Sequence, residues 1–165
     1  MLTRDAFLET CTEDLRICQH IATKLDANKL DYSPGEGMRN TLELMRYLTF
    51  VAAGPTEALI KNDWSVIARY QEEASTMEFA DFATRMETQI ERVAALLAGV
   101  DEDELLSREA TLPWGKTIPL GYALVQTTLK FLTSYKLQLF CYAKASGATE
   151  MSTYNAWMGV DAPPK

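Results

Sequence analysis

The residue types that most often build redox or metal sites are scarce in this sequence, which holds one histidine, His20, and three cysteines, Cys11, Cys18 and Cys141. Zinc, nickel and iron are bound mainly by imidazole and thiolate groups, with carboxylates as partners. His20 follows Cys18 by two positions, and on a helix such side chains point about 160° apart. We therefore predict that His20 is a solvated surface residue on the face opposite Cys11 and Cys18, and that no metal is bound.

The cysteines do not indicate redox or nucleophilic chemistry either. Cys11 and Cys18 lie two helical turns apart, about 10 Å along the axis, which is too far for a disulfide within a helix. Cys141 falls near the C-terminal end of a predicted helix, where a thiolate anion is disfavoured. All three are interpreted as small buried apolar residues.

Other catalytic signatures are also missing. Ser33–Gly37 contains glycines but neither the preceding strand nor the lysine of a phosphate-binding loop. A carboxylate di-iron site needs Glu-x-x-His on paired helices, and therefore two histidines. Glu72–Glu73 and Asp101–Glu104 are interpreted as solvated acidic loops. The sequence thus indicates no catalytic residue and no cofactor.

Length and composition predict one globular domain over residues 1–165, with 47% hydrophobic and 24% charged residues. The net charge of -7 and the pI near 4.8 argue against general affinity for nucleic acid and for anionic membrane surfaces. The charged N-terminus lacks the apolar run of a signal peptide, and no stretch approaches the roughly 18 apolar residues of a membrane span. We therefore expect a soluble cytoplasmic protein.

Helical periodicity dominates the first third of the chain. A helix is predicted over Arg4–Leu25, capped by Thr3, because apolar residues recur at spacings of three and four. These residues are Leu8, Cys11, Leu15, Cys18, Ala22 and Leu25. A second helix is predicted to open at Ser33–Pro34, since Ser caps helices and Pro is tolerated at their first position, and to stop at Gly54–Pro55.

Two more long helices follow. A crossover carrying short helical turns, Thr56–Thr76, is expected to lead to a third helix over Met77–Ala98, with Gly99 as its C-cap. The fourth helix is expected to begin near Pro119 and to end before Gly147. Its apolar face covers such a wide arc that we expect it to be the most buried helix.

The remaining segments are short. Asp101–Thr117 contains Pro113–Gly115 and is predicted to be an extended or turning connection, and the lack of period-two alternation predicts no sheet. The tail, Met151–Lys165, is expected to pack back through aromatic residues such as Trp157, with only Pro163–Lys165 free. The fold class is therefore all-α, a four-helix bundle with a long crossover between helices 2 and 3.

Three segments resemble the DinB-like (YfiT-type) family of four-helix bundles, and the resemblance extends over nearly the whole chain. They are Ser33–Leu48, Leu112–Gly121 and Phe131–Gly147. The third segment is the most specific, because it is similar to the family's His-x-x-x-His-Arg-x-Gln-Leu run followed by a short apolar turn and Gly.

The resemblance implies a metal site that this chain has lost. Members of the family typically hold a divalent metal with three histidines, and some of them transfer thiols or isomerise small organic acids. The matching positions here are Tyr47, Phe131 and Tyr135, none of which is histidine, while Gln138 matches a supporting residue of the family pattern. Phe binds no metal, and Tyr does so only when ionised, which its pKa near 10 opposes.

Two interpretations of these aromatic positions remain open. The aromatic side chains of Tyr47, Phe131 and Tyr135 either fill the vacated space or, together with Gln138, line an apolar pocket for a small hydrophobic ligand. The predicted function is that of a DinB-like protein that binds a small apolar ligand or a protein partner without metal-dependent catalysis. The alternative is a metal-dependent thiol transferase or isomerase with other ligands, so enzymatic activity is left open.

The resemblance also implies a homodimer, since bundles of this type commonly self-associate. Ile17, on the otherwise polar side of the first helix, and the aromatic tail around Trp157 are the candidate contact residues.

Overall fold

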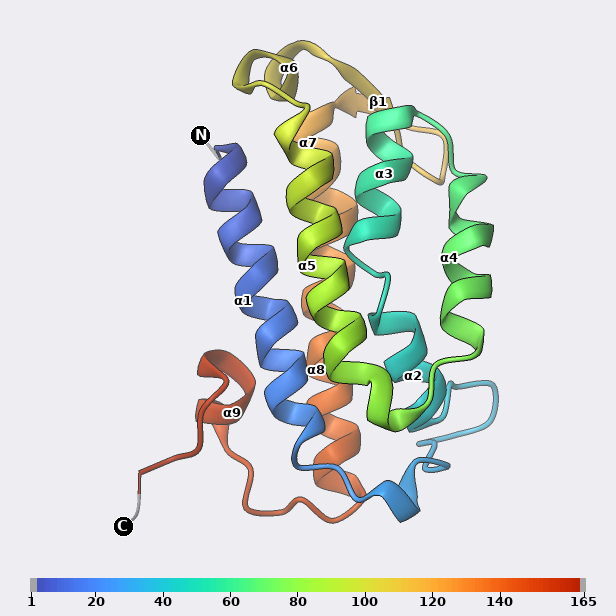
Figure 1. Cartoon of the computed structure of the whole chain (residues 1–165), viewed down its shortest axis with the longest axis vertical. Helices are drawn as coiled ribbons and strands as arrows, with labels where there is room; N and C mark the ends of the chain where they lie inside the picture. The colour runs from blue at the N-terminus through green and yellow to red at the C-terminus, as the bar shows by residue number, and fades with distance from the viewer. Residues whose placement is uncertain (1–2, 164–165) are drawn as a thin grey trace.

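The computed structural model of the protein describes residues 3–163. Its helices, drawn in Figure 1, are α1 (Arg4–Ala22), α2 (Thr41–Leu48), α3 (Ala53–Lys61), α4 (Val66–Ser75), α5 (Phe82–Ala98), α6 (Glu102–Ser107), α7 (Leu120–Leu124), α8 (Lys130–Ala145) and α9 (Thr153–Met158). The other elements are the 3-10 turns η1 (Ala27–Lys29) and η2 (Phe79–Asp81), the π-helical segment η3 (Val125–Leu129), and the strands β1 (Glu109–Thr111) and β2 (Thr117–Pro119).

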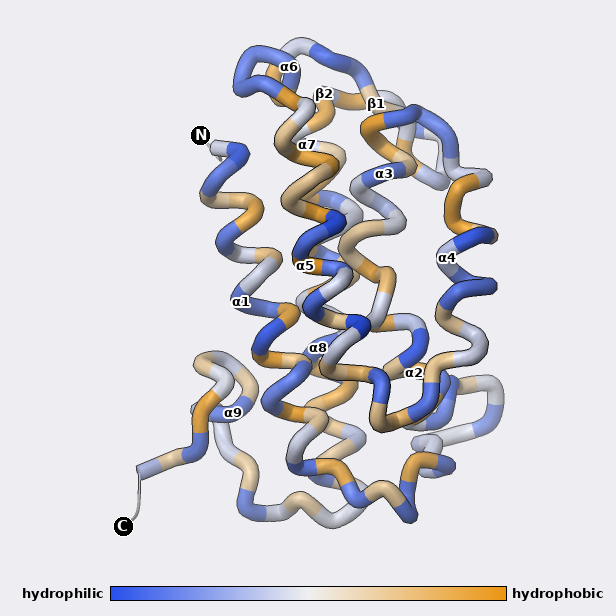
Figure 2. The backbone as a smooth tube through the Cα atoms, in the orientation of Figure 1, coloured by the Kyte–Doolittle hydropathy of each residue, from blue (hydrophilic) through white to orange (hydrophobic). Residues whose placement is uncertain are grey.

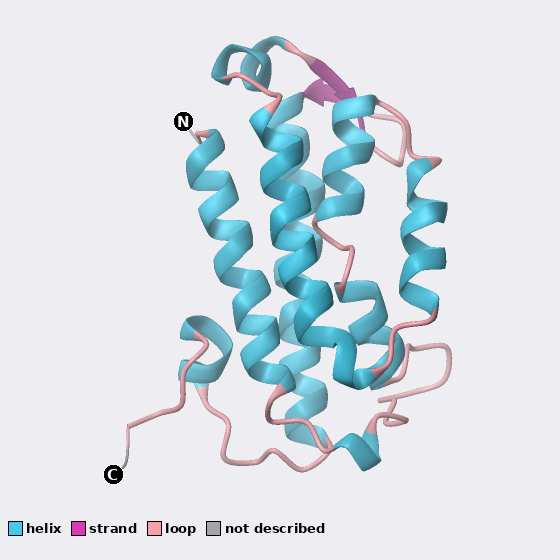
Figure 3. Ribbon diagram, in the orientation of Figure 1, coloured by secondary structure: helices cyan, strands magenta, loops and turns pink. Residues whose placement is uncertain are grey.

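Four columns of helix run side by side along the long axis of the molecule (Figure 3). Two columns are the single helices α1 and α5; the third is α2 continued by α3, and the fourth is α7, η3 and α8 in unbroken succession. Helix α1 packs against α5 and α8, while α2 and α3 pack against α5 and the fourth column. The predicted all-α four-helix bundle is thus confirmed. The predicted crossover, Thr56–Thr76, is shorter than expected, because Thr56–Lys61 belongs to α3 within the bundle and only the part that carries α4 lies outside it.

Helix α1 follows the sequence prediction closely. The Thr3 hydroxyl accepts a hydrogen bond from the Ala6 amide at 3.1 Å, which caps the helix as expected. Cys11 and Cys18 are fully buried in the core. Figure 2 shows the underlying pattern, in which hydrophilic and hydrophobic residues interchange along each long helix. Burial of the apolar stripe therefore places α1 against the bundle.

The second helix begins later than predicted, at Thr41 and not at Ser33–Pro34. Asn40 caps it through a reciprocal pair of bonds: the Glu43 amide donates to Asn40 Oδ1 at 2.9 Å, and the Asn40 amide donates to Glu43 Oε2 at 2.8 Å. The Ser33 hydroxyl instead closes a loop by donating to the carbonyl of Gly35. The capping box is the stronger start signal because it satisfies two amides at once.

Gly54–Pro55 does not end the second helical column, contrary to the prediction. These residues lie in the first turn of α3, where Pro is tolerated because its missing N–H would have no partner within the helix. A Cβ atom at Gly54 would lie 3.1 Å from Cδ1 of Ile67 and 3.3 Å from Cδ2 of Phe50. A side chain at position 54 would therefore fit tightly, and Ile67 of α4 and Phe50 would have to shift by a few tenths of an ångström.

A buried glutamine bridges the break between α2 and α3. Gln89 of α5 is 1% exposed, and its Oε1 accepts hydrogen bonds from the amides of Ala52, at 2.8 Å, and Ala53, at 3.2 Å. Its Nε2 donates to the carbonyl of Leu48 at 2.8 Å. The side chain thus satisfies backbone groups of both helix ends, which have no water to bond to.

The fourth column has the predicted extent, from Leu120 to Ala145, but it contains a π-helical turn. At this turn the hydroxyl of Thr127 donates to the Ala123 carbonyl at 2.8 Å. The hydroxyls of Thr56 and Thr128 lie 3.2 Å apart, so a polar contact joins the widened turn to α3. Such a turn gives no signal in the apolar periodicity.

The prediction of no sheet is wrong at one place. β1 and β2 form an antiparallel hairpin in which Glu109 pairs with Pro119 and Thr111 with Thr117. Gly115 adopts a φ of 88° in the connecting turn, which glycine allows at little cost. Each strand has three residues, too few for alternation to show. The preceding Asp101–Glu104 is the capped start of α6 and not the solvated loop that we predicted.

The tail packs back onto the bundle, as predicted, and covers a residue expected at the surface. Ile17 of α1 is 6% exposed because the segment around Gly159 lies against it. Pro163 is exposed, while the rest of the predicted free end, Pro164 and Lys165, lies outside the described residues.

No helix among residues 3–163 has both the length and the apolar character needed to cross a membrane.

We expect Gln89→Leu to destabilise the protein by about 2–4 kcal/mol, because it leaves buried amides and a carbonyl of the α2–α3 break without partners. Equilibrium unfolding in urea measures the change. Gln71→Leu on the exposed face of α4 is the matched control and should change stability by less than about 0.5 kcal/mol. Equal effects of the two substitutions would contradict the bridging role.

Candidate functional site

The structure brings together two of the four predicted site residues in direct contact. Tyr47, in the last turn of α2, and Tyr135, in the middle of α8, meet edge to face with ring centroids 4.7 Å apart and ring planes at 64°. Both side chains are half-buried. We call these two rings the aromatic corner. Phe131 lies one helical turn before Tyr135 on α8 and packs, partly buried, against the core.

Arg39, which the sequence did not single out, covers the aromatic corner. Its guanidinium carbon lies 4.4 Å from the centroid of Tyr47 and 5.8 Å from that of Tyr135. Both distances fall within the range of cation–π attraction. The corner therefore already holds a positive charge, supplied by the loop before α2.

Gln138, the fourth predicted residue, is linked to the backbone of Arg39 by way of Tyr142. Its Nε2 donates to the Tyr142 hydroxyl at 2.6 Å, and that hydroxyl donates to the Arg39 carbonyl at 3.1 Å. Tyr142 also meets Tyr32 edge to face at 5.5 Å. Three of the predicted residues are thus linked to Arg39, two through their rings and one through a hydrogen-bonded tyrosine.

The residues of the aromatic corner do not fit a divalent metal. Phe131 offers no lone pair, and burial together with the neighbouring Tyr135 raises the pKa of Tyr47, which keeps its phenol neutral. The Arg39 guanidinium would repel a metal ion at the same place. Nowhere in residues 3–163 do three or more His, Cys, Asp or Glu side chains gather closely enough to hold a metal ion.

His20 is not the solvated residue that we predicted. The returning tail leaves its side chain 19% exposed, with Nε2 3.0 Å from Nδ2 of Asn155 and 3.6 Å from Oδ1 of Asp161. Burial lowers the pKa of His20, although Asp161 opposes the shift. His20 therefore helps to anchor the tail.

The cysteines follow the prediction at two of three positions. Cys11 and Cys18 are buried, and burial raises the pKa of Cys11 to about 12 and also raises that of Cys18. Cys141 is exposed, so its prediction as a buried residue is wrong. The periodicity misplaced it because the apolar arc of α8 extends around much of the helix.

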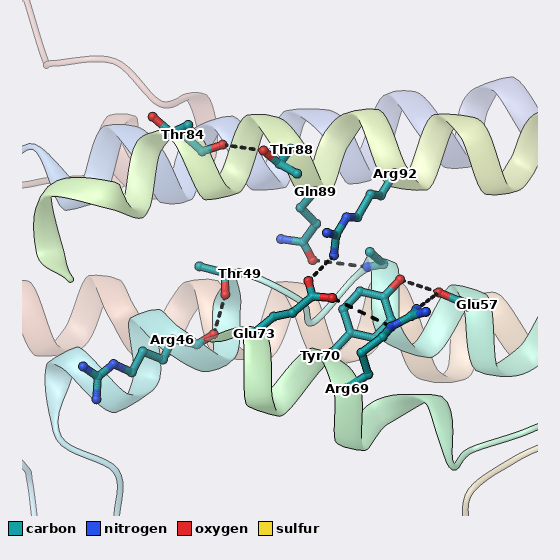
Figure 4. Close-up of polar contacts among 11 residues, drawn as sticks. Arg46, Thr49, Glu57, Arg69, Tyr70, Glu73, Thr84, Thr88, Gln89 and Arg92 are labelled. Carbon is teal, nitrogen blue, oxygen red and sulfur yellow. Dashed lines mark hydrogen bonds and ion pairs between the residues drawn. The ribbon is translucent and has the colours of Figure 1, made fainter. Parts of the chain in front are cut away.

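A second polar cluster lies between α3, α4 and α5 (Figure 4). Glu57 of α3 is 5% exposed, and its carboxylate accepts hydrogen bonds from Lys61 at 2.7 Å, Arg69 at 2.8 Å and the Tyr70 hydroxyl at 2.6 Å. Burial alone would raise the pKa of Glu57. The hydrogen bonds from Lys61 and Tyr70 and the charge of Arg69 have the opposite and larger combined effect, so the pKa of Glu57 is lowered. Burial and Glu57 raise the pKa of Tyr70 to about 12.

This cluster continues into an open groove of about 450 Å³ lined by Arg69, Tyr70, Glu73, Arg92 and Leu96, among others. The Glu73 carboxylate lies 2.7 Å from Arg92 and 3.8 Å from Arg69. Glu73 is thus an ion-pairing residue on α4 and not part of the solvated acidic loop that we predicted at Glu72–Glu73.

A chain of ring contacts connects the two clusters. Tyr47 meets Phe50 at 5.1 Å, and Phe50 stacks on Tyr70 at 6.2 Å with an interplanar angle of 27°. Phe50 lies in the break between α2 and α3. The aromatic corner and the Glu57 cluster therefore share one continuous aromatic wall.

The arrangement of helices is that of a DinB-like bundle. A crystal structure of YjoA, a DinB-like protein from Bacillus subtilis, matches this chain with a TM-score of 0.71 and 21% sequence identity, over 90% of this chain and 96% of that one. No protein-family model matches the sequence, and no curated protein sequence matches it. The likeness establishes the fold, as the three resembling segments predicted.

Sequence reasoning missed Arg39, Gln89 and Glu57. The sequence prediction placed Arg39 inside a helix that begins at Ser33–Pro34. In the structure Arg39 lies in the loop just before Asn40, the residue that caps α2. A polar residue on the buried stripe of α5 was the available signal for Gln89, since such residues need a partner.

Glu57→Gln should reduce the loss of unfolding free energy that occurs when the pH is lowered. The depressed pKa of Glu57 means that its stabilisation is present above the ordinary value of 4.5 and is lost as the pH falls through the folded value. The variant should be less stable at neutral pH, by about 2 kcal/mol, and should lose less stability on acidification. Urea unfolding at neutral and acidic pH, with Glu91→Gln on the exposed face of α5 as control, measures this. Parallel pH curves for wild type and Glu57→Gln would contradict the account.

Proposed function

We propose that this protein binds a small organic molecule at the aromatic corner, without metal-dependent catalysis. The observation that carries the proposal is the contact of Arg39 with both rings, at 4.4 and 5.8 Å, because it shows that the corner presents π faces to a group from outside the bundle. Aromatic faces with one or two polar handles suit small organic ligands. The phenol groups of Tyr47 and Tyr135 supply the handles.

The aromatic side chains also support a binding role over simple filling of space. Tyr47 and Tyr135 are half-buried, so their faces remain reachable when Arg39 moves. Gln138 holds Tyr142 and so anchors the loop beside the corner. A packed plug would not need a charged side chain as its outermost layer.

Benzyl alcohol should bind weakly at the corner and shift the NMR signals of the Tyr47 and Tyr135 rings, because it offers a neutral aromatic face and a hydroxyl. Tyr135→Ala should abolish the shifts at Tyr47. Tyr122→Ala, which removes an exposed tyrosine of α7, should leave them unchanged. Shifts that spread evenly over exposed tyrosines, or no shifts at all, would contradict the proposal.

The alternative function, a metal-dependent thiol transferase or isomerase with other ligands, is tested by metal analysis. Protein purified without a polyhistidine tag should contain only substoichiometric zinc, nickel and iron, because Tyr47 and Phe131 supply no ionised donor. One equivalent of any of these metals, retained through dialysis, would support the alternative.

We also propose that the protein forms a homodimer through α1. In Figure 1, α9 lies beside only the lower half of α1, and the upper half stands at the edge of the molecule. A groove of about 490 Å³ between the two helices, lined by Ile17, Trp157 and Met158, continues into one of about 360 Å³ along Leu8 and Glu9. Trp157 and Met158 are 59% and 63% exposed, which is typical of an interaction surface.

The charges along α1 favour a second copy of this chain as the partner. If two α1 helices cross antiparallel about a two-fold axis between Thr12 and Glu13, Glu9 of each copy faces Arg16 of the other. Two uncovered upper halves then each receive the other copy's α9, which is the self-complementary geometry of a two-fold interface.

Charge exchange tests this interface by sedimentation. Glu9→Arg and Arg16→Glu should each weaken the dimer, because each places like charges opposite one another, by about tenfold for a pair worth 1.4 kcal/mol. The double variant should restore it. A wild-type chain that stays monomeric at all concentrations, or a double variant no better than either single one, would contradict this interface.

A further inference from the structure

We infer that the ligand of the aromatic corner is an organic cation, and that Arg39 is a resident occupant which the ligand displaces. The inference rests on the proposed function, since it names the chemical class of ligand for that site. Two observations support it: the faces of two rings lie against one guanidinium group, and that group has no acidic partner among residues 3–163.

Arg39 has no carboxylate partner among residues 3–163, either as an ion pair or as a hydrogen bond to its side chain. By comparison, Arg69 and Arg92 also lie over a tyrosine ring, that of Tyr70, but each is paired with a glutamate. Attraction to the ring faces is thus the specific contact of the Arg39 side chain. The corner thus holds a positive charge by means of its ring faces, without a negative charge in contact with it.

The position of Arg39 allows its side chain to leave while its backbone stays. The carbonyl of Arg39 is fixed by Tyr142, and Asn40 directly after it caps α2. The side chain itself is exposed, as are all residues from Ser33 to Met38 before it. Removal of the guanidinium from the rings therefore breaks no hydrogen bond and unfolds no helix.

The chemistry of the corner selects weakly hydrated cations. A divalent metal needs lone-pair donors and binds water strongly, whereas guanidinium and quaternary ammonium groups shed water readily and bind to π faces. The rings of Tyr47 and Tyr135 meet edge to face, and both lie within cation–π distance of one cation. Aromatic faces arranged around a cation are the kind of site that holds alkylated ammonium groups.

The charge of the surroundings also favours a cation. Glu43 lies one helical turn before Tyr47 on α2, on the same face of the helix. Its carboxylate accepts a bond from the Asn40 amide and remains exposed. With a net charge of -7, the protein attracts cationic ligands and repels anionic ones.

Choline and its neutral isostere 3,3-dimethyl-1-butanol provide the test, because they share shape and hydroxyl and differ only in charge. Binding to wild type and to Arg39→Ala is measured by isothermal titration calorimetry and by NMR of the tyrosine rings. Choline should bind Arg39→Ala about tenfold more tightly than wild type, since the resident cation is gone, and about tenfold more tightly than the neutral isostere.

Two further variants complete the design. Tyr47→Leu, made in the Arg39→Ala background, keeps apolar bulk but removes a π face, so choline should lose its advantage over the isostere. Lys116→Ala, in the turn of the β-hairpin, removes one positive charge at the other end of the molecule. Lys116→Ala should leave choline affinity at the wild-type value. The comparison shows whether the effect of Arg39→Ala comes from removal of the guanidinium at the corner or from the change in net charge.

Each outcome decides a different statement. Preferential binding of choline to Arg39→Ala, abolished by Tyr47→Leu, supports the inference. Equal binding of choline and its isostere at the corner overturns the cation inference and leaves the proposed function standing. Failure of both probes to bind Arg39→Ala overturns the inference and the proposed function together. Tighter binding of choline to Lys116→Ala as well would overturn the role of Arg39 as the occupant.

Discussion

The three hydrogen bonds of Gln89 hold together a bundle column that is made of two helices where a single one would be expected. Helix α2 ends at Leu48 and α3 begins at Ala53, so both ends would leave backbone groups unpaired in the core. The amide of Gln89 satisfies both ends at once, with 1% of the residue exposed. Without it, the column would have to close into a continuous helix or admit water.

The break sets the position of both polar clusters. It allows Tyr47, on the last turn of α2, to face α8, while Glu57, on α3, faces α4. Phe50 lies in the break itself and joins the rings of Tyr47 and Tyr70. A regular helix through Thr49–Ala52 would change the relative orientation of residues on its two sides, since successive residues of a helix are 100° apart. The break that Gln89 bridges therefore lies in the middle of the aromatic wall.

The long helices could be predicted from the sequence, because apolar periodicity reports burial over many turns. The extent of α1 and of the α7–α8 column follows from this signal. The break before α3 could not be predicted, since it depends on Gln89, more than thirty residues away in the sequence. The start of α2 does have a local signal, the capping box of Asn40 and Glu43, but Ser33–Pro34 resembles a helix start as well. Gly54–Pro55 misled for a different reason: both residues lie in the first turn of α3, where the missing N–H of proline costs no helical hydrogen bond.

The aromatic corner shows a similar limit. The resemblance identified Tyr47, Phe131, Tyr135 and Gln138, but only the fold reveals what lies against them. Arg39 is a loop residue with no periodic signal, and its role arises from the capping of α2 at Asn40. The proposed cation site would therefore depend on a residue that the resemblance does not identify.

The most direct test of cation binding at the aromatic corner is a crystal structure of Arg39→Ala grown with choline. We expect ordered density for the trimethylammonium group against the faces of Tyr47 and Tyr135, in the place that the guanidinium occupies in the native chain. Rings that collapse onto one another and leave no room, or a metal ion bound between them, would contradict it.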